Sequence, residues 1–505
     1  MAAVIAAPAS GSGKTLLSLA LLSWAQQNGR RIQAFKVGPD YLDAQLLSQA
    51  SGQACRNLDL NLCGEAWVRQ AFHGYGGASE LTLVEGVMGL FDGIGSSSTG
   101  STADVARLLD LPVVLVLDAG GQAASLGAIV RGFRDHDPQL RIAGVVLNKV
   151  SSPRHRELLA DVLERMEVPL LGCLPRSEAL ALPGRHLGLA PAHELEAPEQ
   201  RRQAWAALAS QHLTLERLVP LLQAPRPGPH PLASIRVEQG QPLPVALASD
   251  AAFHFRYQET SELLEHMGMP VLRWSPLADE AIPADAKGLI LPGGFPEQHA
   301  AQLSGCTRSL SSLRSFVQQR PLYAECGGML VLGEQLTDLD GTSHRMAGLL
   351  PFTAKRGPLQ VGYRRLQARQ DSPVVQSGQQ LVGHEFHRWE LHSNRASSDR
   401  SVLWDIEGWK VHRHSEGWVD QTVHASWVHL HWASSTTICS RWRAALESGE
   451  RRSPNASSAA SSPRGSNPSP NAGAGLSKAG FSGWGSAPAA IVEPWISASA
   501  AGCAT

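Results

Sequence analysis

Residues 8–15, "PASGSGKT", have the residue types and spacing of a phosphate-binding loop. Glycines in such a loop let backbone N–H groups approach phosphate oxygens. Lys14 can reach the outer phosphates of a nucleotide, and the Thr15 hydroxyl can bind Mg²⁺. Pro8 replaces the first glycine of the pattern, which serves the turn more than the phosphate. A glycine-rich turn is the alternative, but it leaves the Lys-Thr pair unexplained. The predicted nucleotide-binding residues of this loop are Gly11, Ser12, Gly13, Lys14 and Thr15.

Acidic residues follow two further apolar runs, in "KVGPDYLD" and "VEGVMGLFDG". In a parallel sheet, the loops at the carboxyl ends of the strands meet at one edge. Mg²⁺ prefers oxygen ligands, so Thr15, Asp40 and Glu85 are the predicted metal ligands. The alternative for Asp40 and Asp92 is that each only shapes a turn. The charged residues of the two segments are Lys36, Asp40, Asp43, Glu85 and Asp92.

A later apolar run, "VVLNKV", ends with Asn148 and Lys149. Base-recognition residues of phosphate-loop proteins follow a strand in the same way. We therefore include both residues in the predicted nucleotide site.

A second chemical signal is Cys326, which lies between an apolar strand and an apolar helix in "PLYAECGGMLVL". This is the pattern of a nucleophile on a strand-to-helix elbow, where the helix N-terminus favours the thiolate. The N–H groups of Gly293, Gly294 and Gly327 could form an oxyanion hole. The base could be His429 or His431, both in "ASWVHLHW". The alternative is that Cys326 is a buried core residue.

Two alternations of strand and helix patterns must position these residues. Each predicts an α/β domain, and the first predicts a parallel sheet covered on both faces. A Pro-rich segment separates them, and the C-terminal composition of Ser, Ala, Gly, Pro and Asn predicts a disordered tail. The predicted units are an ATP-binding domain (1–223), a linker (224–243), a thiol-hydrolase domain (244–447) and the tail (448–505).

Composition excludes several classes of protein. The formal net charge is −1 in 505 residues, which argues against binding to nucleic acid or an anionic membrane. No run of about 18 apolar residues predicts a membrane span. Seven cysteines without a CxxC pair indicate a reducing cytoplasm rather than a disulfide framework or a zinc cluster. The sequence leaves a homodimer open as the assembly state.

The pairing of a phosphate loop with a thiol hydrolase predicts a coupled reaction. The thiol domain would release ammonia from glutamine. The ATP domain would phosphorylate a carboxylate, and ammonia would then displace the phosphate to form an amide.

The whole set of motifs resembles the cobyrinic acid a,c-diamide synthase family, over about residues 2–445. The motifs are "PASGSGKT", "KVGPDYLD", "VEGVMGLFDG", "LPGGFPE", "AECGGM", "GHEFH" and "HLHW". The resemblance implies a dethiobiotin-synthetase-like domain, a class I glutamine amidotransferase domain, ATP, Mg²⁺, and cobyrinic or hydrogenobyrinic acid as substrate.

Carried over to this sequence, the resemblance makes Cys326 the nucleophile and His429, rather than His431, its base. The family's Cys-His pair lacks the usual third carboxylate, and none is assigned here. Asp92 is expected to act in catalysis. Residues implied to face the corrinoid are Lys36, Tyr41, Leu42, Asp43 and Asp92.

Several rival functions remain to be separated. Cobyric acid synthase and nickel-sirohydrochlorin a,c-diamide synthase share the fold and chemistry, but amidate other carboxylates or another macrocycle. A ligase such as dethiobiotin synthetase, or a partition-type ATPase, would leave the thiol domain unexplained. Glutamine hydrolysis separates the amidases from the ligase and from the partition-type ATPase.

Overall fold

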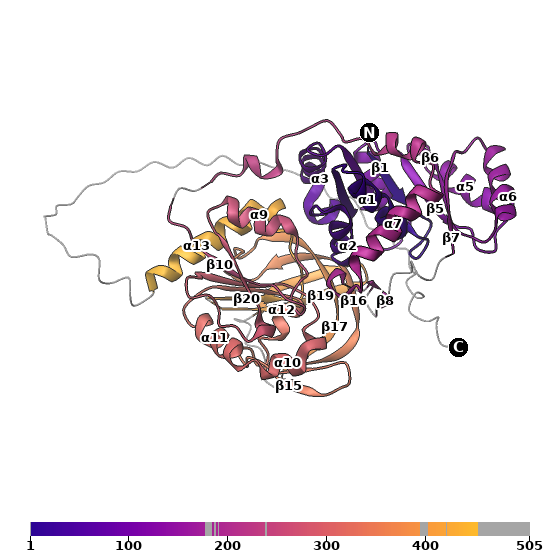
Figure 1. Ribbon diagram of the computed structural model, residues 1–505. Helices are drawn as coiled ribbons and strands as arrows, with labels where there is room; N and C mark the ends of the chain where they lie inside the picture. Colours follow the sequence, from indigo (N-terminus) through magenta and orange to yellow (C-terminus); the bar gives the residue numbers. More distant parts are fainter. Residues whose placement is uncertain are drawn as a thin grey trace, which may run out of the picture.

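The structure is a computed structural model that describes residues 2–176, 184–185, 188–189, 191–237, 240–393, 402–420 and 422–452. Two β-sheets organise these residues, one in each half of the chain (Figure 1). Both halves mix helices with a parallel sheet, as the alternating sequence pattern predicts. No helix in these ranges is long and apolar enough to cross a membrane.

The first sheet has seven parallel strands. Its central strand is buried on both faces, because Val4 and Ala6 enter one apolar core while Ala3 and Ile5 enter another. In order across the sheet, the strands are β3 (Arg56–Leu58), β2 (Ile32–Val37), β4 (Leu81–Glu85), β1 (Ala3–Ala6), β5 (Val113–Asp118), β6 (Ile142–Val150) and β7 (Leu170–Pro175).

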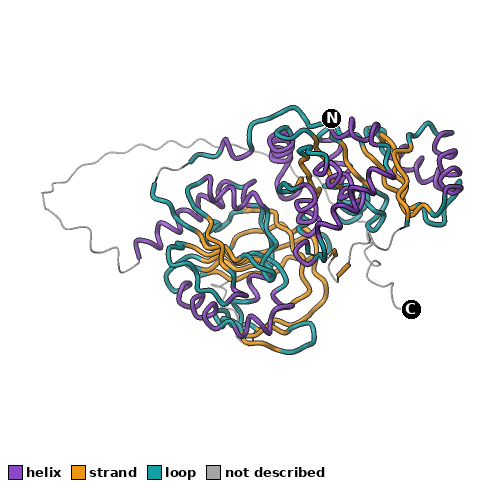
Figure 2. Tube along the Cα trace, viewed as in Figure 1, coloured by secondary structure: helices purple, strands orange, loops and turns teal. Residues whose placement is uncertain are grey.

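Helices cover both faces of this sheet (Figure 2). One core contains side chains of α1 and α7, and the other contains side chains of α3 and α4. The helices of this half are α1 (Lys14–Gln27), α2 (Leu42–Ser51), α3 (Leu60–Gly76), α4 (Thr102–Leu108), α5 (Ser125–His136), α6 (Pro153–Glu164), α7 (Pro198–His212) and α8 (Leu215–Leu218). A two-stranded ladder joins β8 (Gly184–Arg185) to β9 (Gly188–Leu189).

The second sheet begins with five parallel strands and continues as an extension that is antiparallel except for the parallel pair of β14 and β16. The parallel strands are β11 (Val271–Trp274), β10 (Val245–Ala248), β12 (Gly288–Leu291), β13 (Leu322–Glu325) and β20 (Val423–Ser426). The extension contains β19 (Val411–Val419), β18 (Val402–Gly408), β16 (Thr353–Ala368), β17 (Gln380–His392), β14 (Gln335–Thr337) and β15 (Ser343–Arg345).

Helices also lie on both sides of the second sheet (Figure 1). They are α9 (Gln258–His266), α10 (Ala300–Gly305), α11 (Thr307–Val317), α12 (Gly327–Leu330) and α13 (Thr436–Arg452). Single 3₁₀ turns are η1 (Ala192–Glu194), η2 (Val219–Leu222), η3 (Pro231–Ser234), η4 (Pro276–Ala278), η5 (Pro296–His299) and η7 (Trp432–Ser434).

The segments outside the two sheets differ from a simple linker and tail. Within residues 224–243, η3 packs on α3 and Leu232 is buried in the core. Helix α13 continues to Arg452, so it crosses the predicted tail boundary at 447/448. The rest of the predicted tail, residues 453–505, lies outside the described residues.

The two halves are joined by polar and apolar contacts. Arg56 of β3 binds both carboxylate oxygens of Glu262 in α9, at 2.9 and 2.6 Å. Gln45 of α2 donates to the His254 carbonyl at 2.9 Å. The interdomain apolar cluster consists of Tyr41, Leu42, Phe255, Tyr257 and Phe295. The carboxyl edge of the first sheet therefore faces the second half.

Candidate functional site

The phosphate-binding loop lies between β1 and α1, as the sequence predicts. Gly13 has φ +112°, and a Cβ there would lie 2.4 Å from Nδ2 of Asn148, so only glycine fits. The Asn148 amide donates to the Ser12 carbonyl at 3.0 Å and so braces the loop. Lys149 pairs with Asp118 at 2.6 Å. Of the two predicted base-recognition residues, Asn148 therefore contacts the loop, while Lys149 pairs with Asp118 at the end of β5.

Lys14 is folded back onto the backbone around it. Its Nζ donates to the carbonyl oxygens of Met88 and Ala9, at 2.5 and 3.2 Å. Burial, with repulsion from Lys36, lowers the pKa of Lys14 to about 8. A phosphate would supply the negative charge that favours the protonated form of this side chain.

Lys36 is the centre of a buried charge cluster at the ends of β2 and β4. Its Nζ lies 2.8 Å from Glu85 Oε1 and 2.5 Å from Asp43 Oδ2. Burial opposes the charge on Lys36, but Asp43 and Glu85 outweigh it and raise the pKa of the lysine. Thr15 donates to the same Glu85 oxygen at 3.0 Å. The predicted metal and substrate residues of these loops therefore form one connected network.

Asp40 and Asp92 have the turn-shaping contacts that the sequence allowed as an alternative. Asp40 Oδ1 accepts the backbone N–H of Asp43 at 2.9 Å, and Asp92 Oδ2 accepts that of Gly89 at 2.8 Å. Burial, with repulsion from Asp43, raises the pKa of Asp40 to about 7. The negative charge of Asp43 that contributes to this shift would also attract a cation, which would bind Asp40 in its deprotonated form.

Cys326 lies at the elbow between β13 and α12. Its backbone has φ +48° and ψ −119°, a strained conformation for a residue with a side chain. Its thiol donates to the Phe386 carbonyl in β17 at 3.7 Å. Backbone strain at a residue between a strand and a helix is the geometry of a nucleophile elbow.

His429 is the histidine that contacts the thiol. Its imidazole interacts electrostatically with Cys326, and its Nδ1 lies 3.2 Å from Glu325 Oε1. Burial alone would lower the pKa of His429, but Cys326 and Glu325 raise it to about 10. The thiol and imidazole can thus form a thiolate–imidazolium pair.

The predicted oxyanion glycines come together beside the thiol. A Cβ on Gly327 would lie 2.8 Å from the Gly294 carbonyl oxygen, and one on Gly293 would lie 2.5 Å from Cε1 of His429. Gly294 has φ +155°, and a Cβ there would lie 2.1 Å from the Ala252 carbonyl oxygen. Close approach of three backbone segments therefore requires glycine at this turn.

The two sites meet through Tyr41. Tyr41 follows Asp40 directly, yet its ring centroid lies 5.1 Å from that of His429 and 4.8 Å from that of Tyr257. Tyr41 and Leu42, which the family resemblance directs to the corrinoid, belong to the interdomain cluster. The segment that carries the ligase-site carboxylates thus also forms a wall of the thiol site.

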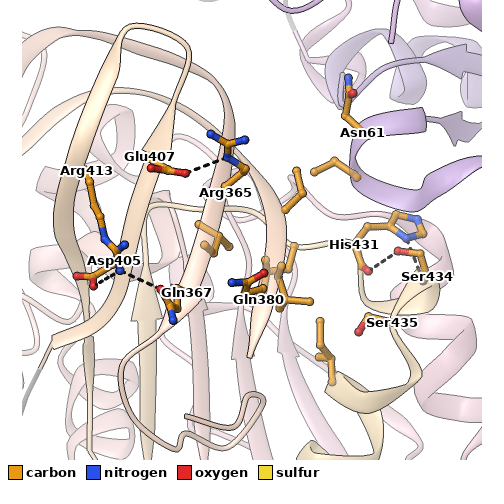
Figure 3. A pocket seen from close by; sticks show the side chains of 16 residues that line it. Asn61, Arg365, Gln367, Gln380, Asp405, Glu407, Arg413, His431, Ser434 and Ser435 are labelled. Carbon is orange, nitrogen blue, oxygen red and sulfur yellow. Dashed lines mark hydrogen bonds and ion pairs between the residues drawn. The ribbon is translucent and has the colours of Figure 1, made fainter. Parts of the chain in front are cut away.

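A cavity of about 680 Å³ opens between the two halves beside this junction (Figure 3). Its lining comes from α3, the antiparallel extension and the segment after β20. Polar lining residues are Asn61, Arg365, Gln367, Gln380, Asp405, Glu407, Arg413, His431, Ser434 and Ser435. His431 lines this cavity and does not bond to the thiol, which supports His429 as the base.

Sequence reasoning did not find Glu325. Two features of the sequence bear on this residue. A carboxylate immediately precedes the thiol in "AECGG", and the residue two positions after the base is a histidine, His431, and not a carboxylate. Their meaning depends on the pairing of β13 with β20, which aligns Glu325 with Ser426.

Comparisons with known proteins agree with a nucleotide-binding half and a glutamine amidotransferase half. A model of the CobQ/CobB/MinD/ParA nucleotide binding domain matches residues 3–189, and one of the CobB/CobQ-like glutamine amidotransferase domain matches residues 244–437. Cobyrinate a,c-diamide synthase of Gloeobacter violaceus is 43% identical over 445 residues, 88% of this chain and 96% of the relative. That of Synechocystis sp. is 40% identical over 453 residues, 88% and 93% of the two chains. Hydrogenobyrinate a,c-diamide synthase of Rhodobacter capsulatus is 42% identical over 392 residues, 76% and 88% of the two chains. The chain belongs to the cobyrinate and hydrogenobyrinate a,c-diamide synthase family.

Proposed function

We propose that the protein uses ATP and glutamine to convert the a and c carboxylates of a corrinoid acid, cobyrinate or hydrogenobyrinate, into amides. The observation that carries this proposal is the contact between Tyr41 and His429, which joins a phosphate-loop site to a thiol site. A ligase that consumes ammonia and a hydrolase that releases it benefit from such proximity.

The ligase half activates the carboxylate. An oxygen of the acceptor carboxylate attacks the terminal phosphorus of ATP, ADP leaves, and an acyl phosphate forms. Backbone N–H groups of the loop, with Lys14, hold the phosphates and offset the charge of the transferred group. Ammonia then attacks the acyl carbon, phosphate leaves, and the amide remains.

The residues Thr15, Asp40 and Glu85 fit a Mg²⁺ ion. Glu85 Oε2 is fully buried and has no hydrogen-bond partner among the described residues, which is costly unless a cation or donor approaches it. Thr15, Asp40 and Glu85 would hold the ion, which when bound would supply positive charge to offset that of the phosphates. Lys36 would hold Glu85 and Asp43 in place around the phosphates.

Two acidic residues are assigned to the acceptor side of this half. Asp92 would position the acyl phosphate or take a proton from the attacking ammonia, at the loop that also contacts Lys14. Asp43, through its pair with Lys36, would orient the side chain being amidated. Asn148 would keep the loop in its phosphate-binding conformation.

The amidotransferase half supplies ammonia. The Cys326 thiolate attacks the amide carbon of glutamine, and the N–H groups of Gly294 and Gly327 stabilise the oxyanion. His429 protonates the leaving nitrogen, so that ammonia departs and a thioester remains. Water, deprotonated by His429, then cleaves the thioester to glutamate and restores the thiol.

The decisive experiment is a product assay. The protein is incubated with ATP, Mg²⁺, glutamine and one of several acids: cobyrinate, hydrogenobyrinate, a diamidated corrinoid or nickel-sirohydrochlorin. Mass spectrometry should show a gain of two amides on one of the first two acids. Amidation of only the diamidated corrinoid or nickel-sirohydrochlorin would contradict the proposal. The cytoplasmic location and the homodimer stay predictions.

A further inference from the structure

A carboxylate reaches the catalytic imidazole from the strand that precedes the thiol. Glu325 is the last residue of β13, and its Oε1 lies 3.2 Å from His429 Nδ1. Its other oxygen, Oε2, accepts a hydrogen bond from the Tyr323 hydroxyl at 2.7 Å. The side chains of Glu325 and His429 are only 7% and 1% exposed. Glu325 is therefore held in place by a second buried group and directed at His429.

His431, two positions after His429, cannot take the role of Glu325 beside the imidazole. His431 Nδ1 accepts the backbone N–H of Ser434 at 3.2 Å, and its ring packs on Trp67 and Tyr257. Figure 3 shows its ring beside the interdomain cavity, on the side of Asn61. Burial lowers the pKa of His431 to about 3, so it is neutral and carries no compensating charge.

We propose that Glu325 is a positioning residue that completes a Cys326–His429–Glu325 triad in the thiol site. Its carboxylate would accept a hydrogen bond from the Nδ1–H of His429 and leave the other ring nitrogen for the thiol and the leaving ammonia. This inference rests on the proposed glutamine hydrolysis. It assigns a third member where the family resemblance implies only a Cys-His pair.

His429 Nδ1 and Glu325 Oε1 lie within ion-pair distance, but their geometry does not meet that of a hydrogen bond. Catalytic hydrogen bonds are often loose in the free enzyme and tighten when substrate binds. A rotation of the Glu325 carboxyl is limited by Tyr323, so the ring of His429 has the greater freedom to adjust.

Four titratable groups face His429. Cys326 and Glu325 come from β13 and its elbow, Tyr41 comes from the ligase half, and His384 comes from β17. Burial raises the pKa of Tyr41 and lowers that of His384 to about 3, so both are neutral near pH 7. Of these four groups, Glu325 and the thiolate are the ones that can stabilise the imidazolium.

The test is the pH dependence of glutamine hydrolysis in Glu325→Gln. Loss of the negative charge favours the neutral imidazole, so the alkaline limb of kcat/KM should move to lower pH by about one unit or more. The hydrolysis rate should fall roughly 10- to 100-fold. The alkylation of Cys326 by iodoacetamide, followed by peptide mass spectrometry, should slow at pH 7 because less thiolate is present.

Glu416→Gln is the matched control. Glu416 is part-buried and accepts hydrogen bonds from Ser426 Oγ and Trp427 N, beside β20, and no described contact joins it to His429. This variant should keep the wild-type pH profile and alkylation rate. If Glu325→Gln does not fold, Glu325→Asp can be used instead, because its shorter side chain moves the negative charge away from His429. The pH profile and the alkylation rate should then change in the same direction as in Glu325→Gln, but by less.

The outcomes separate this inference from the proposed function. A wild-type profile and alkylation rate in a folded Glu325→Gln or Glu325→Asp variant would overturn the triad. If Cys326→Ala abolishes hydrolysis in the same series, the proposed function stands while the triad falls. Absence of glutamine hydrolysis in the wild-type protein would instead contradict the proposed function.

Discussion

At the scale of single residues, both sites place charged or reactive side chains where burial makes the environment decisive. Cys326 is 4% exposed and strained, while Glu85 is fully buried with one oxygen unpaired. Such arrangements cost stability and persist because the surrounding fold fixes them. The two sites nevertheless use separate residues, so substitutions in one should leave the chemistry of the other intact.

Cys326→Ala should separate the two nitrogen sources. The thiol has no contact with Lys14, Lys36 or Glu85, so ammonia-dependent amidation should stay within about threefold of the wild-type rate. Glutamine-dependent amidation should fall at least roughly 10³-fold, because the nucleophile is lost. Amide formation is followed by mass spectrometry with either nitrogen source. A folded variant that loses both activities would contradict the division of labour.

Asp40 should make stability depend on pH. Its pKa is about 7 in the folded protein against an ordinary value of 3.8, so the folded state binds the extra proton. The corresponding stability is present below about pH 4 and is lost as the pH rises to 7. Asp40→Asn mimics the protonated form and should be more stable than wild type at pH 8, by roughly 1–3 kcal/mol.

The comparison is made by chemical denaturation at pH 4.5 and pH 8 without Mg²⁺. Equal free energies of unfolding for the two proteins at pH 8 would show that the charge on Asp40 does not destabilise the folded state. Addition of Mg²⁺ at pH 8 should stabilise the wild type more than Asp40→Asn, because the metal favours the charged carboxylate.

At the scale of elements, the segment from the end of β2 to the start of α2 serves both sites. Asp40 and Asp43 lie in the ligase network, while the intervening Tyr41 contacts the imidazole of the thiol site. The ring of Tyr41 also stacks on Phe255, with centroids 5.4 Å apart and planes 6° apart. Aromatic contacts of this kind exclude water and restrict the motion of the segment.

Tyr41→Ala should uncouple the two reactions. Loss of the ring opens the interface to solvent, so more glutamate should form for each amide, by roughly two- to tenfold. The assay uses glutamine labelled with ¹⁵N at the amide, together with unlabelled ammonium. The product of the wild type should carry mostly ¹⁵N, whereas the product of Tyr41→Ala should be diluted with ¹⁴N.

Tyr41→Phe is the control for this experiment, because it keeps the ring and removes only the hydroxyl. It should stay close to wild type in the ratio of glutamate to amide. Equal isotope dilution in Tyr41→Ala and wild type would mean that ammonia does not pass along this interface.

Local sequence signals predicted a large part of both sites. Glycines and apolar runs mark the phosphate loop and the elbow at Cys326, and each depends only on neighbouring residues. Glu325 and Tyr41 could not be assigned in this way, because their contacts with His429 join residues more than a hundred positions apart. The long β16–β17 ribbon was also missed, since much of it is exposed and its apolar pattern is interrupted.

At the scale of the whole molecule, the two halves are joined by a buried ion pair as well as by the aromatic cluster. Arg56 lies over the ring of Tyr75, 4.0 Å from its centroid, and binds Glu262 through two hydrogen bonds. A second carboxylate, Glu259, lies 3.8 Å from the same guanidinium and is 1% exposed. The charges of two buried groups, Arg56 and Glu259, and of the part-buried Glu262 therefore depend on the two halves being docked.

Arg56→Met and Glu262→Gln should each weaken the docking of the halves. Arg56→Met leaves the buried Glu259 and the part-buried Glu262 without their cation, whereas Glu262→Gln leaves Arg56 with the more distant Glu259 alone. Each change should cost about 2–4 kcal/mol. The double variant should lose less than the sum of the two single losses, with a coupling of roughly 1–3 kcal/mol. Arg30→Met is the matched control, since the pair of Arg30 with Glu80 is exposed and 3.7 Å long, so it should cost less than about 1 kcal/mol.

The measurement is thermal unfolding, monitored separately for each of the two halves. In the wild type the halves should unfold together, because docking stabilises both. In each single variant the transition should split or broaden, and glutamine-dependent amidation should fall more than ammonia-dependent amidation, since only the former needs transfer between sites. If the single variants unfold like Arg30→Met and keep the wild-type ratio of the two activities, the ion pair does not hold the halves together. The docking would then depend on the aromatic cluster around Tyr41, and Tyr41→Ala would be expected to split the transition instead.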